Sequence, residues 1–325
     1  MLLEIALLFV GLTFLMVGGE AVVRGATGMA RALGVSPLVI GLTVVAFGTS
    51  APELAVNAIA AWSGRSGIAF GNIMGSNMAN IGAIVAATAL LRPIRVTGVV
   101  IVRELPMMLL ATSVAVVMAF DALLSGGPDR YSRGDGVVLL MLFLVFLYYT
   151  VGDFVKQRTN HLAEPHDLGA PQPVNRTGFY AALTVIGLAG LLGGAQITVG
   201  AATNVARAFG VSEVVIGLTV LAFGTSLPEL VASIMATLRG HAELAIGNVV
   251  GSNIFNLLLV CGVTSLINPI EVPKGGHLDL MMVALLSLVL FGISITRQRR
   301  IIRGEAFVLL ASYVAYIVWR SAAGP

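Results

Sequence analysis

The chain has 325 residues, of which 57% are hydrophobic and only 11% charged, and its formal net charge is +3. Soluble domains carry about 25% charged residues, so this composition excludes a soluble globular protein and indicates a polytopic membrane protein. The single cysteine, Cys261, excludes a disulfide within the chain.

Ten stretches are long enough to cross a membrane, because a span needs about 20 mostly apolar residues. In chain order they lie at residues 3–23, 36–61, 69–91, 97–119, 134–152, 178–199, 212–237, 244–267, 278–296 and 303–320. A polar segment at 153–177 separates them into two groups of five. We therefore predict an all-α polytopic fold with about ten transmembrane helices: a first repeat over 1–152, a linker over 153–177 and a second repeat over 178–325.

The two groups of spans contain the same sequence twice. Residues 34–54 and 210–230 are identical at 17 of 21 positions, and the same alignment continues without a gap to place 71–77 on 247–253. Because each repeat has an odd number of spans, the second repeat inserts upside down relative to the first. This inverted arrangement is the plan of many secondary transporters.

The positions of the basic residues predict the orientation in the membrane. If the N-terminus is outside, 13 of the 19 Lys and Arg residues fall in inside segments. The positive-inside rule then places the 153–177 linker in the cytoplasm and both termini outside. We expect a multi-pass protein of the inner (plasma) membrane.

The sequence Gly-Thr-Ser-x-Pro-Glu occurs at 48–53 and at 224–229, near the middle of a predicted span in each repeat. A proline inside a helix removes one backbone donor, so nearby carbonyl groups can turn away from the helix axis. A carboxylate at membrane depth, here Glu53 or Glu229, is costly and indicates a functional site. A structural kink and a carboxylate that reaches water are the alternatives. The carbonyl groups in question belong to Ala46, Thr49, Ala222 and Thr225.

A second motif, Gly-Asn-x-x-Gly-Ser-Asn, occurs at 71–77 and 247–253. Its glycines fit close helix packing, which is the alternative interpretation. Packing does not explain the polar residues, which recur every four positions and so line one face of each helix. We expect these two faces to complete a coordination shell with the glutamates. Their residues are Asn72, Ser76 and Asn80, and Asn248, Ser252 and Asn256.

Carbonyls, hydroxyls and carboxylates are hard oxygen ligands, which suit Na⁺ and Ca²⁺. All four histidines fall in predicted loops and Cys261 stands alone, so zinc, copper and iron are poor candidates. We predict Ca²⁺ and Na⁺ as transported substrates, no cofactor, no nucleic-acid partner and no enzymatic activity. A membrane-embedded hydrolase would need a nucleophile and base, which the sequence does not offer.

The doubled motifs, GTSxPE followed by GNxxGSN, resemble the repeats of the sodium/calcium exchanger branch of the cation/calcium exchanger superfamily. The resemblance covers nearly the whole chain and is greatest to prokaryotic members with ten spans and a short linker. It implies four central cation sites formed by the second, third, seventh and eighth spans, with the first and sixth spans sliding across them. The residues that it implies as ligands are Glu53, Glu229, Ser50, Ser226, Ser76, Ser252, Asn80 and Asn256, with the carbonyl groups of Thr49, Thr225, Ala46 and Ala222.

The sequence departs from many family members at Asn256, where those proteins carry Asp. Both repeats here have Asn, as in the potassium-independent exchangers, so the predicted site holds two formal negative charges. We predict an electrogenic, K⁺-independent Ca²⁺/Na⁺ antiporter that works by alternating access, as a monomer in the bilayer. The alternatives are an H⁺/Ca²⁺ exchanger, disfavoured by the absence of the GNxxE motifs of that branch, and a cation channel.

Overall fold

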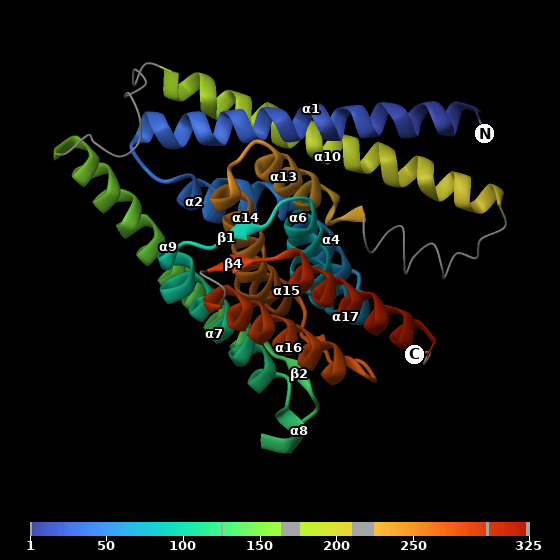
Figure 1. Ribbon diagram of the computed structural model, residues 1–325. Coiled ribbons are helices and arrows are strands. Elements are labelled where there is room, and N and C mark those ends of the chain that lie inside the picture. Colours follow the sequence, from blue (N-terminus) through green and yellow to red (C-terminus); the bar gives the residue numbers. More distant parts are fainter. Residues whose placement is uncertain (1, 125, 164–175, 210–223, 297–298, 323–325) are drawn as a thin grey trace. The chain divides into compact units, whose positions relative to one another are not determined.

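The computed structural model describes residues 2–124, 126–163, 176–209, 224–296 and 299–322, which are almost entirely helical (Figure 1). They form two compact units, and each unit takes segments from both halves of the sequence. The first unit comprises Met1–Thr49 and Thr150–Asn248, and the second comprises Ser50–Tyr149 and Val249–Pro325. The boundaries of the two sequence repeats stay a prediction.

Eight helices among the described residues are long and apolar enough to cross a membrane, or nine if the pair separated at Ser50 is one span. The predicted all-α polytopic membrane fold is thereby confirmed. The α-helices are α1 (Leu2–Leu33), α2 (Pro37–Ile40), α3 (Ala46–Thr49), α4 (Ala51–Trp62), α5 (Ser66–Ala79), α6 (Ala86–Leu91), α7 (Leu105–Met118), α8 (Asp121–Leu124), α9 (Arg133–Ala163), α10 (Thr177–Ala208), α13 (Leu227–Leu238), α14 (Ala242–Ile254), α15 (Cys261–Ile267), α16 (Gly276–Ile295) and α17 (Arg303–Ala322).

Among the described residues, four π-helical segments continue these helices: η1 (Gly41–Val45), η2 (Asn80–Val85), η3 (Val100–Glu104) and η6 (Phe255–Val260). The π-helix is rare and occurs mostly at functional sites. Asn80 and Asn256 lie at the start of η2 and η6, so the same irregularity occurs in both repeats at equivalent polar residues. It widens the helix where the sequence predicts an ion ligand.

Helices α1 and α10 are longer than the apolar stretches that predicted them. Each has 32 residues, or about 48 Å of helix, whereas the hydrocarbon core is about 30 Å thick. The C-terminal part of α1 carries Arg24 and Arg31, since a helix already nucleated continues through polar residues. Likewise α9 runs to Ala163, into the segment predicted as linker.

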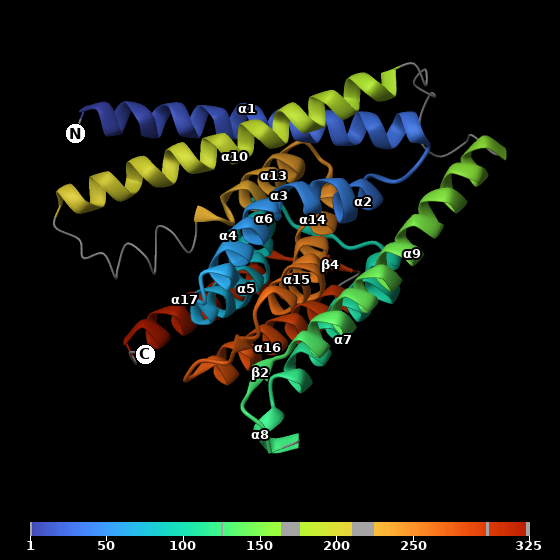
Figure 2. The same cartoon turned by 180° about the vertical axis from the view of Figure 1, so that it is seen from behind.

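In the first unit, α1 and α10 lie side by side along their length (Figures 1 and 2). They contact each other through a glycine seam, defined as Gly11, Gly18 and Gly25 of α1 with Gly187 and Gly194 of α10. A Cβ atom added to Gly18 would lie 2.7 Å from the Leu191 nitrogen, and one on Gly187 would lie 2.6 Å from the Val22 nitrogen. The seam therefore brings backbone against backbone.

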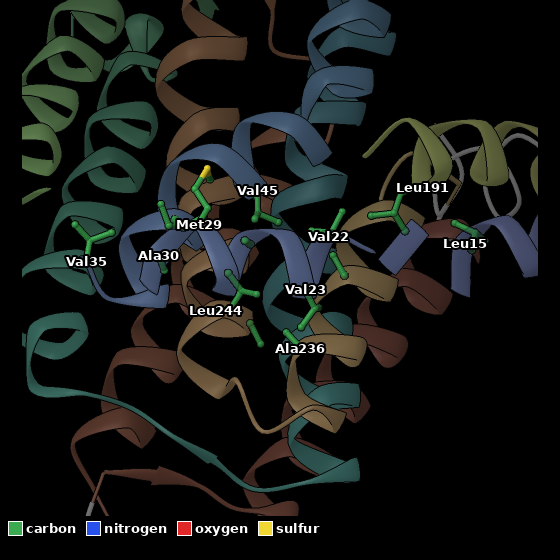
Figure 3. Packing of buried hydrophobic residues seen from close by; sticks show 14 of the residues in the cluster. Leu15, Val22, Val23, Met29, Ala30, Val35, Val45, Leu191, Ala236 and Leu244 are labelled. Carbon is green, nitrogen blue, oxygen red and sulfur yellow. The ribbon is translucent and has the colours of Figure 1, made fainter. Parts of the chain in front are cut away.

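The apolar core of the first unit forms where α1 meets α10, α13 and α14. Figure 3 shows Val22 and Val23 of α1 in this cluster with Leu191 of α10, Ala236 of α13 and Leu244 of α14. These side chains are at most 2% exposed. The cluster fixes α13, which carries Glu229, against α1.

The second unit is closed by two short antiparallel ladders. Strand β1 (Ile94–Arg95) pairs with β4 (Arg300–Ile301), and β2 (Arg130–Tyr131) pairs with β3 (Ile270–Glu271). Strands β1 and β3 occupy equivalent positions when the two sequence repeats are aligned, so the repeat seen in the sequence is also present in this unit.

The helices that follow β2 and β4 begin in the same way. At each start a carboxylate accepts from a backbone N–H three residues earlier, Asp135 from Ser132 at 2.8 Å and Glu305 from Ile302 at 3.0 Å. The adjacent arginines, Arg133 and Arg303, donate to the carbonyls of Leu266 and Leu90 at 3.2 and 2.9 Å. The two acceptors are again equivalent positions of the two repeats.

Candidate cation site

The GTSxPE motif breaks the second span. Helix α3 ends at Thr49 and α4 begins at Ala51, with Ser50 between them at φ −85° and ψ 4°. Ser226 has nearly the same backbone, φ −88° and ψ 4°, before α13 begins at Leu227. Each proline lies in the first turn of a new helix, where its missing N–H costs nothing, so the expected mid-helix kink is a helix break.

Each glutamate of the motif lies in the first turn of its helix, Glu53 in α4 and Glu229 in α13. Both side chains are 1% exposed. The N-terminus of a helix carries a partial positive charge, which stabilises a carboxylate there. The break therefore places each carboxylate at the positive end of a helix dipole.

In the second unit, Glu53 lies among hydroxyl and amide groups. The Ser76 hydroxyl donates to Glu53 Oε1 at 3.3 Å. One turn further along α4, Asn57 Nδ2 lies 2.6 Å from both the Glu53 carbonyl and Asn72 Oδ1. Asn57 thus joins the helix that carries the glutamate to α5, which carries the GNxxGSN motif.

In the first unit, Asn248 makes the corresponding connection. Asn248 Nδ2 donates to Ser233 Oγ at 3.0 Å, and the Glu229 carbonyl lies 3.5 Å away. Its Oδ1 accepts from the Thr49 hydroxyl at 3.2 Å. Asn248 therefore links α14 to both α13 and the end of α3, and so to both GTSxPE motifs.

Further polar groups are buried in the second unit. Asn80 Nδ2 donates to Asn253 Oδ1 at 3.3 Å. Ser252 and Asn256 are completely buried, and among the described residues the Ser252 hydroxyl and both Asn256 amide atoms have no hydrogen-bond partner. Buried polar atoms are costly unless they are satisfied, so these oxygens are suited to a cation.

The structure distributes the predicted ligands between the two units and describes all but one of them. Their coordination of an ion stays a prediction. The first unit holds Ala46, Thr49, Thr225, Ser226 and Glu229, and the second holds Ser50, Glu53, Ser76, Asn80, Ser252 and Asn256. Ala222 lies outside the described residues.

Two residues of this network escaped the sequence analysis, namely Asn57 and Ser233. Each lies four positions after its glutamate, on the same helical face, and the two are equivalent positions of the repeats. That spacing was the available signal. Both residues lie outside the two repeated motifs, GTSxPE and GNxxGSN.

The groups assembled in each unit can bind a hard cation. A buried carboxylate, serine hydroxyls and amide oxygens are the donors that Na⁺ and Ca²⁺ prefer. No cluster of three or more His, Cys, Asp or Glu that could hold a metal occurs among the described residues. The groups that the hydrogen bonds place beside Glu53, the Ser76 hydroxyl and the Asn57 amide, are neutral.

A multi-pass helical protein with repeated helix breaks and a buried carboxylate at each break belongs to the class of membrane transporters. The family model described as "Sodium/calcium exchanger protein" matches residues 3–152 and 179–322. The chain belongs to this family, which is a family of transporters and not of enzymes.

Several relatives align over almost their whole length. The putative antiporter CaxA of Alkalimonas amylolytica is 41% identical over 97% of this chain and 98% of its own. The inner membrane protein YrbG of Escherichia coli is 35% identical, covering 98% and 96%, and the sodium/calcium exchanger MaX1 of Methanosarcina acetivorans is 33% identical, covering 96% and 97%. A solved structure of the sodium-calcium exchanger NCX_Mj matches with a TM-score of 0.83 at 33% identity, covering 98% of each chain.

Proposed function

We propose that this protein exchanges Ca²⁺ for Na⁺ across the membrane by alternating access. The observation that carries the proposal is the pair of glutamates, Glu53 and Glu229. Each is buried in the first turn of a helix that begins at a break. The Ser76 hydroxyl donates to the Glu53 carboxylate, and Asn248 Nδ2 lies 3.5 Å from the Glu229 carbonyl. Family membership and the printed names of MaX1 and NCX_Mj support the same pair of ions.

Competition for the same carboxylates couples the two fluxes. We propose that Glu53 and Glu229 share one set of ions, because they occupy equivalent positions in the two sequence repeats. Two carboxylates balance one Ca²⁺, or are shared among several Na⁺ ions. A site filled by one ion species excludes the other, and the site opens to only one side at a time.

Uptake of ⁴⁵Ca²⁺ into proteoliposomes tests this function. Vesicles loaded with Na⁺ should accumulate Ca²⁺ when diluted into Na⁺-free buffer, and vesicles loaded with choline should not. Saturable uptake that stops when the Na⁺ gradient is dissipated supports an antiporter. Ca²⁺ entry that does not saturate and needs no counter-ion would instead indicate a channel.

Proton coupling is the alternative that the buried carboxylates allow, because a carboxylate can exchange a cation for a proton. The same vesicles prepared without Na⁺, with an imposed pH gradient, separate the two cases. Uptake driven by the pH gradient alone would show that the counter-ion is H⁺ and not Na⁺.

We further propose that transport is electrogenic. The resemblance to sodium/calcium exchangers implies that three Na⁺ exchange for one Ca²⁺, which would move one net charge in each cycle. A K⁺ diffusion potential set with valinomycin should therefore raise or lower the initial rate according to its sign. A rate that ignores the potential would mean electroneutral exchange.

Transport should not require K⁺. Asn256 and its repeat mate Asn80 are neutral amides, which offer an oxygen but no charge. With two carboxylates ionised, the site has no third charge for an additional K⁺. Asn256→Asp should add that charge and make uptake sensitive to pH or to K⁺, because like charges in a low-dielectric site favour binding of a proton or cation. Strict K⁺ dependence of the wild type would contradict this.

The linker is proposed to be cytoplasmic, with both termini outside. In a Cys261→Ser background, Lys156→Cys should resist an impermeant maleimide added to intact cells, and Ala122→Cys should react. Both positions are exposed, so accessibility within the protein does not decide the outcome. The reverse labelling pattern would show that the orientation in the membrane is opposite to the one proposed.

A further inference from the structure

A row of three buried side chains in the second unit ends at Asn80. The sulfur atom of Met108, on α7, lies 3.7 Å from Asn253 Nδ2 on α14. Asn253 Oδ1 in turn accepts from Asn80 Nδ2 at 3.3 Å. All three side chains are at most 1% exposed. We call Met108, Asn253 and Asn80 the amide relay.

The chemistry of Met108 sets the direction of the amide relay. A thioether sulfur carries no hydrogen, so it can only accept a hydrogen bond. Asn253 must therefore turn its NH₂ group toward Met108 and its oxygen toward Asn80. Asn80 then has to present its own NH₂ group to Asn253, which leaves Asn80 Oδ1 outside the relay. This oxygen is buried and has no hydrogen-bond partner among the described residues.

The second repeat has no such relay. Val283 of α16 stands where the first repeat has Met108, because Thr112 and Ser287 donate in the same way to the carbonyls four residues earlier, those of Met108 and Val283. Valine offers no side-chain acceptor. Asn77, the mate of Asn253, donates instead to the carbonyl of Ile73 in its own helix at 2.7 Å. Neither amide atom of Asn256, the mate of Asn80, has a hydrogen bond among the described residues.

We propose that Met108 and Asn253 are positioning residues that hold the Asn80 amide with its oxygen toward the transported cation, while Asn256 must orient its own amide when the ion binds. The proposal rests on the assignment of Asn80 as a ligand in the proposed function. A ligand that is held in its bound orientation loses less rotational freedom on binding. The two asparagines that the sequence repeats are then unequal: Asn80 is fixed and Asn256 is adjustable.

Ion affinity, measured apart from maximal rate, tests the amide relay. Asn253→Ala should raise the Ca²⁺ concentration for half-maximal uptake by roughly two- to tenfold, which corresponds to ordering one side chain. Met108→Leu keeps the volume but removes the acceptor, so it should act in the same direction with a smaller effect. Asn77→Ala is the matched control in the other repeat, and it should leave the half-saturating concentration unchanged.

A double-mutant cycle with Asn80→Ala separates positioning from a general structural role. Asn253→Ala should have no further effect on affinity once the Asn80 amide is absent. An equal effect in both backgrounds would overturn the relay. If the Asn253→Ala protein cannot be reconstituted into vesicles, the double-mutant cycle of Met108→Leu with Asn80→Ala replaces it. Met108→Leu should then have no further effect on affinity once the Asn80 amide is absent.

The same measurements separate this proposal from the function on which it rests. If Asn80→Ala weakens ion affinity while Asn253→Ala and Met108→Leu do not, the relay is wrong and Asn80 remains a ligand. If Asn80→Ala leaves the ion affinity unchanged, Asn80 is not a ligand, and the proposed role of the amide relay is wrong as well. Na⁺-driven Ca²⁺ uptake by the wild type is the independent measure of the exchange function.

Discussion

Two pairs of membrane-spanning segments in this protein differ in how much of their surface is buried by the rest of the protein. In α1 and α10 only 22% and 28% of the most apolar stretch is buried, whereas the spans at Ser66–Leu91 and Ala242–Ile267 are 83% and 78% buried. The exposed pair is joined by glycine backbone, and the buried spans carry the serine and asparagine side chains. Polar groups are thus kept where protein surrounds them, because lipid cannot satisfy them.

The difference shows which contacts tolerate change. The glycine seam depends on shape alone, since backbone atoms cannot move away from an added side chain. The buried spans depend on donors and acceptors, since their polar side chains are held by specific hydrogen bonds. Substitutions that add a larger side chain should therefore destabilise the packing of α1 against α10. Substitutions that keep the size but change the polarity should instead affect the buried spans.

The largest effect is expected at the carboxylates of the buried site. Glu53→Gln and Glu229→Gln keep the shape but remove the charge that balances Ca²⁺, so each should abolish Na⁺-driven ⁴⁵Ca²⁺ uptake. Glu271→Gln, at an exposed position, is the control and should transport normally. Near-normal Ca²⁺ uptake by either variant, purified and folded, would contradict the proposed role of that glutamate in binding Ca²⁺.

The next effect is expected at the glycine seam. Gly18→Leu should lower the free energy of unfolding by about 3 kcal/mol, because its Cβ would lie 2.7 Å from the Leu191 nitrogen. Gly193→Leu on α10 is the matched control, since no neighbouring atom of the described residues lies within 4 Å of an added Cβ there. Thermal unfolding in detergent measures both variants, and equal stability would show that the two helices are not held by backbone contact.

A smaller effect is expected from the amide that joins the helix breaks in the first unit. Asn248→Ala removes the partner of both Thr49 and Ser233, which should cost about 2 kcal/mol. Asn204→Ala, exposed on α10, is the control and should be nearly neutral. Chemical denaturation compares the two, and a neutral Asn248→Ala would mean that these hydrogen bonds add nothing to stability.

The smallest effect is expected in the turn that precedes α14. Burial lowers the pKa of His241 below its usual 6.5, and the charge of Arg31 lowers it further. The unfolded chain then binds a proton more readily than the folded protein, so stability should fall as the pH drops below about 6.5. His241→Asn should make the unfolding temperature less dependent on pH in this range. An unchanged slope in the variant would exclude His241 as its source.

Much of the fold could be predicted because the relevant signals are local. The apolar stretches indicate the spans, and the similarity of the two halves of the chain reveals the duplicated motifs. The helix ends were less predictable. Helix α1 continues past residue 23 to Leu33 and α9 continues to Ala163, because hydrogen bonding within a helix does not stop where hydrophobicity stops.

The sequence indicates which types of residue form the candidate site, but it does not indicate all the hydrogen bonds that connect them. Glu53, Ser76 and Asn80 were identified from motif spacing, and the structure confirms that Ser76 contacts Glu53. Asn57 was missed, although it bonds to both the Glu53 carbonyl and Asn72. Such a role depends on which helix lies opposite, and spacing along a single helix does not report it.

The sequence by itself determined that this is a membrane protein of two related halves, each with one motif glutamate, Glu53 or Glu229, because composition, repetition and charge are properties of the chain. The tertiary structure decided that Ser50 separates two helices and that the duplicated asparagines differ. Asn80 is oriented through Asn253 by Met108, whereas the second repeat has Val283 instead of Met108. The physical reason is that an amide's direction is set by the donors and acceptors packed against it, and those come from segments distant in the chain.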